Sequence, residues 1–224
     1  LAQGKVVGLQ TSVYWLPYFP KDMRFHFNAH NLLVYGKEGD DYLISDPVAE
    51  EPQRCASADL LRARFAKGAL APKGLLYYPD RPGNTQVSAQ AIRKAIVKTT
   101  RIMLGPIPIV GVRGMRMLAK RIERLEANDF GLNYIGHVVR MQEEIGTGGA
   151  GFRFLYASFL QEAAAICQLP ELEQLADRLN TIGDDWRNFA LRAARMIKCR
   201  EPVEFALLAK ALRALADQEE AFFR

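Results

Sequence analysis

Apolar and polar positions alternate through much of the first eighty residues, which is the pattern of β-strands with one buried face. Residues 4–16 alternate in this way and are rich in Val, Tyr and Trp, so they predict a strand. Two shorter apolar runs, 30–36 and 41–47, are separated by a polar stretch that contains Gly39. Apolar runs joined by a glycine-containing polar turn predict a β-hairpin.

A short helix and an extended piece complete this first part. Ser57 precedes the helical sequence ADLLRARFAK and is expected to cap it, and Gly68 is expected to end it. The sequence LLYYPDRPGN then predicts an extended segment leading into a Pro/Gly-rich linker at 79–84.

The apolar period changes to three and four residues from Ser88 onward, which predicts helices joined by short connections, as in a helical bundle. The chain as a whole is therefore predicted to be α+β, with an antiparallel sheet domain at 1–82 and an all-α helical bundle at 83–224. The expected helices run from Ser88 to Gly105-Pro106, over 112–125, over 132–145 up to Gly146, from Phe152 to Leu169-Pro170, from Glu171 to about Cys199 with a bend near Gly183, and onward from Pro202.

The composition is that of an ordinary globular protein, with 49% apolar and 25% charged residues among 224. No run of eighteen uncharged apolar residues occurs, so no transmembrane segment is expected. The first residues lack the pattern of a signal peptide, and the chain begins with Leu rather than Met, which suggests a fragment. The three cysteines form no CxxC pair, so no metal site is expected and a reducing, cytoplasmic location is predicted.

Positive charge is concentrated in one segment of the chain. The net charge is +5, but residues 81–130 alone carry ten basic and three acidic side chains. Such a surface suits an acidic partner protein, although a solvated face or a membrane contact gives the same pattern. Few aromatic residues are interleaved with these charges, which argues against nucleic acid as a partner. The candidate partner-binding residues are Arg113, Arg116, Lys120 and Arg121.

Two histidines, His26 and His30, lie four residues apart. On a helix this spacing would place two zinc ligands on one face, but the glutamate of HExxH sites is missing and the surroundings are strand-like. His30 and Asp46 flank the predicted hairpin and are expected to meet at one edge of the sheet. The carboxylate would then accept the Nδ1 proton and stabilise the imidazolium, the orienting role in nucleophilic catalysis. The alternative is a surface histidine beside a turn aspartate that precedes proline.

A nucleophile for this pair is not evident. Cys55 follows the hairpin in a loop, and nothing in the sequence places it beside His30. Cys167 and Cys199 lie on apolar helix faces, where a small core residue is expected. The serines near the hairpin in sequence lie in no GxSxG elbow.

Two further segments are candidates for binding. The glycine-rich sequence GTGGAGFR, residues 146–153, opens a predicted helix and could bind a phosphate through backbone amides. It lacks the GK[ST] of a P-loop, and glycines that only let two helices pack closely look the same. Aromatic residues also crowd the stretch before His30, where they form either core or the wall of a substrate pocket. The candidate substrate-binding residues are Tyr14, Trp15, Tyr18 and His26.

These segments together resemble known families. The sequence VYWLPYFPKDMRFHFNAHNLLVYG, followed by DDYLISDP and the SADLLRARF helix, resembles the C-terminal part of the butirosin biosynthesis protein H N-terminal domain. The sequence GTGGAGFRFLYASFLQEAA resembles the signature of the helical domain of unknown function that often follows that domain. The resemblance covers roughly residues 5–200.

The resemblance implies a papain-like fold, present here in part, and transfer of an acyl group from an acidic acyl carrier protein to a small amine through a cysteine thioester. His30 matches the family's catalytic histidine and Asp46 its carboxylate. The family's cysteine lies upstream of the aromatic segment, so a fragment or a member without its nucleophile is expected, and Ser12 stands where relatives tend to carry Asp. The resemblance implies no cofactor of the chain's own, because 4'-phosphopantetheine is carried by the partner protein.

Three functions stay open on this basis. The first is a carrier-dependent acyltransferase of antibiotic or other specialised-metabolite biosynthesis. The second is a papain-like peptidase that acts on a leader peptide. The third is a binding protein that docks a carrier protein or an exporter without chemistry. An exposed sheet edge would also permit a homodimer.

Overall fold

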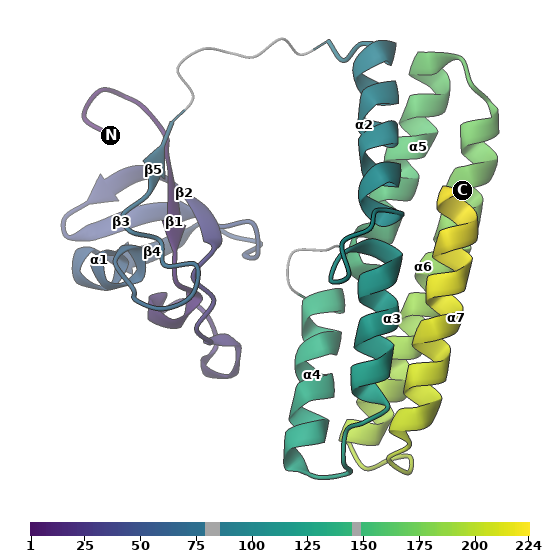
Figure 1. The fold of residues 1–224 in the computed structure, drawn as a ribbon. Helices are drawn as coiled ribbons and strands as arrows, with labels where there is room; N and C mark the ends of the chain where they lie inside the picture. Colours follow the sequence, from purple (N-terminus) through teal and green to yellow (C-terminus); the bar gives the residue numbers. More distant parts are fainter. Residues whose placement is uncertain (79–85, 145–148) are drawn as a thin grey trace. The chain divides into compact units, whose positions relative to one another are not determined.

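A computed structural model describes residues 1–78, 86–144 and 149–224. The chain divides into two compact units, Leu1–Thr85 and Gln86–Arg224 (Figure 1). The first unit is built on an antiparallel sheet and the described part of the second is helical, which confirms the α+β prediction. The predicted linker at 79–84 and the stop at Gly146 lie outside the described residues.

The first unit contains a sheet of five strands in the order β4-β3-β2-β1-β5, and each neighbouring pair is antiparallel (Figure 1). Its described elements are β1 (Val7–Thr11), the 3₁₀ turns η1 (Val13–Trp15) and η2 (Lys21–Met23), β2 (His30–Glu38), β3 (Asp41–Ser45), β4 (Gln53–Ala56), α1 (Ser57–Arg64) and β5 (Leu76–Tyr77).

Strands β2 and β3 form the predicted hairpin. Glu38 pairs with Asp41 across the turn, and Gly39 adopts the φ of +60° that a tight turn favours in glycine. The register shifts by one residue between Val34 and Gly36. On its other edge β2 pairs with β1 without a register shift, and His30 lies opposite Thr11.

One face of this sheet is buried. Along β2 the side chains of His30, Leu32 and Val34 are buried, and the residues between them are exposed. They share a core with residues of β1, β3, β4, η1 and α1. Because side chains alternate across a strand, the register that buries Leu32 and Val34 also buries His30.

Three local predictions for the first unit are wrong. The strand predicted over 4–16 ends at Thr11, because η1 turns the chain. Ser57 does not cap α1: the N-cap is Ala56, and the Ser57 hydroxyl instead donates to the Asp40 carbonyl at 2.7 Å. The helix also ends at Arg64, before the predicted stop at Gly68.

The second unit consists of helices that lie along a common direction (Figure 1). Ser88 caps the first of them, as its side chain accepts a hydrogen bond from the Ala91 amide at 3.2 Å. The described elements are α2 (Ala89–Met103), α3 (Gly111–Ile122), α4 (Asp129–Glu143), the 3₁₀ turn η3 (Ala150–Phe152), α5 (Arg153–Cys167), α6 (Glu171–Ile197) and α7 (Phe205–Phe223).

Helix α6 is the centre of this bundle and packs against α4, α5 and α7, while α3 packs against α7. The helix is continuous through Gly183. A Cβ at Gly183 would lie 2.7 Å from a ring carbon of Phe154, so glycine is what lets α5 approach α6 there. No helix in the described part of the chain is long and apolar enough to cross a membrane.

Candidate functional site

His30 and Asp46 meet in the first unit. His30 is the first residue of β2 and Asp46 directly follows β3, so the two ends of the hairpin bring them together. The Nε2 atom of His30 lies 2.7 Å from Oδ2 of Asp46. The Asp46 side chain is fully buried and the His30 side chain is 10% exposed, so the imidazole retains a small accessible surface.

Two more donors hold the Asp46 carboxylate. The Tyr18 hydroxyl donates to Oδ2 at 2.7 Å, and the Val48 amide donates to Oδ1 at 2.9 Å. Tyr18 lies in the loop between η1 and η2, and Val48 lies in the turn after β3. Both carboxylate oxygens are therefore fixed, which restricts the orientation of the His30 ring.

These contacts determine the charge of the carboxylate. Burial acts to raise the pKa of Asp46, but hydrogen bonds from His30, Tyr18 and the Val48 amide outweigh it and lower the pKa below its ordinary value. Burial and the bond to Asp46 raise the pKa of Tyr18, so Tyr18 stays a neutral donor. The result is a buried carboxylate that is ionised at neutral pH.

The hydrogen bond also assigns the histidine tautomer. An ionised carboxylate only accepts, so Nε2 of His30 carries the proton and Nδ1 of the neutral ring is the basic nitrogen. The prediction that Asp46 accepts the Nδ1 proton is therefore wrong, although the pairing itself is present. Phe19 packs edge-on against the ring at 5.5 Å between centroids and further restricts its rotation.

Cys55 is not a nucleophile for His30. It lies on β4 in the core of the unit, 1% exposed, and its thiol lies 3.7 Å from the Ala56 carbonyl. Burial, with the charges of Asp59 and Asp41, raises the pKa of the thiol to about 12. A thiol with that pKa remains protonated at neutral pH, and the thiolate is the reactive form.

The predicted substrate-binding residues separate into two places. Tyr18 donates to Asp46 and also lines a pocket of about 230 Å³ between the loop that follows η1 and the turn that follows β3. Tyr14, Trp15 and His26 form an exposed cluster instead: Tyr14 stacks on His26 at 4.1 Å and meets Trp15 edge-on at 5.0 Å. The pocket is lined by Tyr18, Phe19, Pro20, Met23, Val48, Ala49 and Gln53.

Sequence reasoning missed two parts of this site. The sequence predicts only a substrate-binding role for Tyr18 and no role for Val48. Nothing in the spacing of Tyr18 and Asp46, 28 residues apart, indicates their contact. For Val48 a signal was available, since an aspartate before proline commonly accepts from the amide two residues on.

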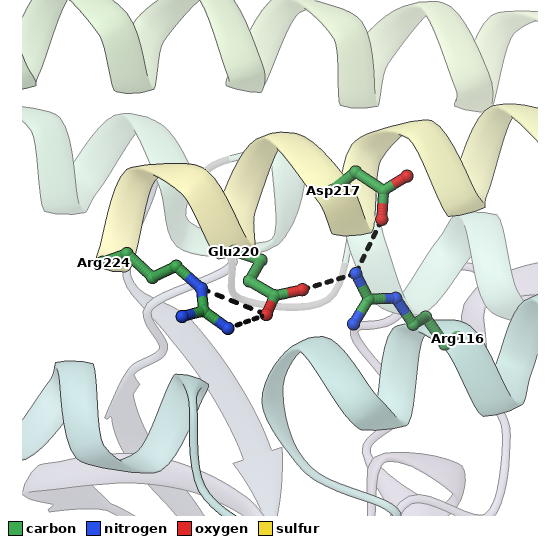
Figure 2. A network of polar contacts seen from close by, with 4 residues as sticks. All are labelled: Arg116, Asp217, Glu220 and Arg224. Atoms are coloured by element: carbon green, nitrogen blue, oxygen red, sulfur yellow. Dashed lines mark hydrogen bonds and ion pairs between the residues drawn. The ribbon is translucent and has the colours of Figure 1, made fainter.

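Three of the four predicted partner-binding residues make contacts within the bundle. Arg116 forms ion pairs with Asp217 at 2.6 Å and Glu220 at 2.5 Å, and Figure 2 shows its guanidinium between these two carboxylates of α7. Arg121 lies over the Tyr134 ring at 5.1 Å. Arg113 donates to the Pro106 carbonyl at 3.3 Å, and Lys120, the fourth residue, makes no such contact with another described residue.

The described end of the glycine-rich segment has a structural role. Gly151 and the residues on either side of it have positive φ, a conformation that is costly outside glycine. Arg153 holds this turn by donating to the Gly151 carbonyl at 2.7 Å and to both carboxylate oxygens of the buried Glu219. Trp186 donates to the same carboxylate at 2.6 Å. The charge of Arg153 is therefore matched within the bundle, which favours the structural interpretation over anion binding.

No group of three or more His, Cys, Asp or Glu side chains within residues 1–78, 86–144 and 149–224 could hold a metal ion. The hydrogen-bonded site consists of a histidine, its carboxylate and a tyrosine. Such a set can accept a proton from an attacking group and return it to a leaving group.

Two family models match separate parts of the chain. Residues 1–47 match the family model described as butirosin biosynthesis protein H, N-terminal. Residues 58–224 match the model described as a domain of unknown function, DUF4872. No curated protein matches the chain. The first match ends directly after Asp46, so it contains both members of the histidine–carboxylate pair.

Proposed function

We propose an acyl-transfer function for this chain, which belongs to the DUF4872 family over residues 58–224 and matches the butirosin biosynthesis protein H N-terminal family over residues 1–47. The acyl group would come from an acyl carrier protein, and the acceptor would be a small amine. The description of the butirosin biosynthesis protein H family supports a role in antibiotic or related biosynthesis. The observation that carries the proposal is the buried Asp46–His30 pair, which leaves Nδ1 of His30 basic.

In the first half-reaction His30 acts as the general base for a thiol. Nδ1 accepts the proton of a cysteine thiol, and the thiolate attacks the thioester carbonyl on the carrier. A carbon–sulfur bond to the cysteine forms, the bond to the carrier's phosphopantetheine sulfur breaks, and the imidazolium returns the proton to that sulfur. Asp46 stabilises the imidazolium while it exists. Cys55 does not supply the thiol, so the proposal requires a cysteine outside the core of the sheet unit.

In the second half-reaction His30 acts as the general base for the amine. The amine nitrogen attacks the acyl-cysteine carbonyl, and Nδ1 accepts the proton that the nitrogen loses. The carbon–nitrogen bond forms, the carbon–sulfur bond breaks, and the cysteine sulfur takes the proton back. The pocket beside Tyr18, of about 230 Å³, supports binding of a small acceptor rather than a large one.

The test is transfer from an acyl-loaded carrier to an amine, catalysed by a protein that contains this chain together with the required cysteine, followed by mass spectrometry of the product. His30→Ala is expected to lower the transfer rate by about 10²–10⁴-fold, the usual contribution of a general base. His137→Ala is the matched control, because His137 is exposed on α4 in the other unit. Equal rates for the wild type and His30→Ala would contradict the proposal.

One observation favours a second candidate, a binding protein without chemistry. Cys55, the one cysteine of residues 1–85, is buried and protonated. A chain that binds the loaded carrier but leaves its thioester intact, with and without an added amine, would favour this second candidate.

A further inference from the structure

The basic residues of α2 differ from Arg116 of α3. Arg93, Lys94, Lys98 and Arg101 are all exposed, and none makes a side-chain hydrogen bond or an ion pair to another described residue. On α3, by contrast, the charge of Arg116 is matched by two carboxylates of α7 (Figure 2). The four cations of α2 therefore carry positive charge that no carboxylate of the described residues matches.

These four cations border an apolar groove. The groove has a volume of about 610 Å³ and lies between α2 and the loop that joins it to α3. Val97 and Ile102 line it from the helix, and Ile107 lines it from the loop, with exposures of 47%, 48% and 56%. Exposed aliphatic side chains collected in one groove are typical of a binding surface.

The dimensions of the groove favour a helix over other occupants. Its lining on α2 runs from Gln90 to Ile102, which is about 18 Å at 1.5 Å per residue. Small-molecule sites enclose most of their ligand, whereas the aliphatic side chains of this groove are about half exposed. A bilayer surface is flat and would not fill a groove. An amphipathic helix fits, with apolar side chains in the groove and its flanks against the cations.

We propose that the groove lined by α2 and by Gly105, Pro106, Ile107 and Val110 docks an acidic amphipathic helix of a partner protein. The aliphatic side chains of the helix contact Val97, Ile102 and Ile107, and its carboxylates pair with Arg93, Lys94, Lys98 and Arg101. The inference stands without the acyl-transfer proposal, because neither the groove nor its test involves His30.

The test uses the full chain and a fluorescently labelled synthetic helix of eighteen residues, with leucines on one face and glutamates on the flanks. Fluorescence anisotropy measures its Kd. A second peptide carries glutamine in place of each glutamate, and is expected to bind at least about tenfold more weakly at low salt, since several charge pairs are lost. Equal binding of the two peptides, or no binding of the acidic peptide, would overturn the proposal.

Two pairs of variants locate the site. Lys94→Glu with Lys98→Glu is expected to weaken binding about tenfold or more, whereas Lys120→Glu on α3 leaves it nearly unchanged. Ile102→Ser is expected to weaken binding, whereas Ile109→Ser, exposed but outside the groove lining, is not. Equal effects of the two members of either pair on peptide binding would contradict the placement of the binding site in this groove. Binding to phosphatidylserine vesicles at the expense of the acidic peptide would also overturn it, in favour of a membrane contact.

Discussion

At the scale of single residues, the site depends on the buried carboxylate of Asp46. Three donors converge on it, from His30, Tyr18 and the Val48 amide. Hydrogen bonds to a charged group contribute more than those between neutral groups, about 1.5–3 kcal/mol each. The same contacts that stabilise the unit also fix which nitrogen of His30 is basic.

This arrangement predicts a pH dependence of stability. Because the pKa of Asp46 is lowered in the folded protein, its contribution is complete above the ordinary carboxyl pKa and is lost as the pH falls through the native value. The difference in unfolding free energy between the wild type and Asp46→Asn should therefore shrink as the pH falls below about 4. Urea denaturation from pH 3 to 7 measures it. A difference that does not change with pH would contradict the role of this carboxylate.

At the scale of elements, the turn before α5 is held by a buried ion pair. Glu219 on α7 is fully buried and accepts from Arg153 on α5 and from Trp186 on α6. Its carboxylate thereby links three helices of the bundle. Arg153 in turn holds the left-handed residues that precede α5.

Removing the charge of Glu219 should therefore destabilise the bundle strongly. Glu219→Gln leaves the guanidinium of Arg153 without its counter-charge, and breaking a buried pair costs about 3–5 kcal/mol. Glu123→Gln is the matched control, since its partner Arg213 lies at the exposed surface and a much smaller loss is expected. Thermal unfolding of both variants gives the comparison. Similar losses would mean that the Arg153–Glu219 pair has no special role.

Sequence periodicity predicted elements better than it predicted contacts. The β2–β3 hairpin followed from two apolar runs around Gly39, because the pleat and the turn are local properties. The helices of the second unit followed from their apolar period in the same way. Ser57 shows the limit, because its hydroxyl contacts the hairpin turn at Asp40 rather than its own helix. Similarly, the pairing of Tyr18 with Asp46 depends on how the chain folds between them.

At the scale of the whole molecule, the family boundary and the structural boundary differ. The DUF4872 match begins at residue 58, within α1, whereas the second compact unit begins at Gln86. Leu60 and Ala63 of α1 are buried in the core of the sheet unit. The two family matches therefore share one folded unit, and that unit contains the histidine pair.

Nδ1 of His30 is the basic nitrogen of the site because Asp46 accepts from Nε2. Long-range ¹⁵N–¹H correlation spectra of the labelled chain test it most directly, at a pH where the ring is neutral, with His30→Ala to assign the signals. The account predicts a protonated Nε2 and an unprotonated Nδ1 for His30, and loss of this preference in Asp46→Asn. A protonated Nδ1 in the wild type would contradict it.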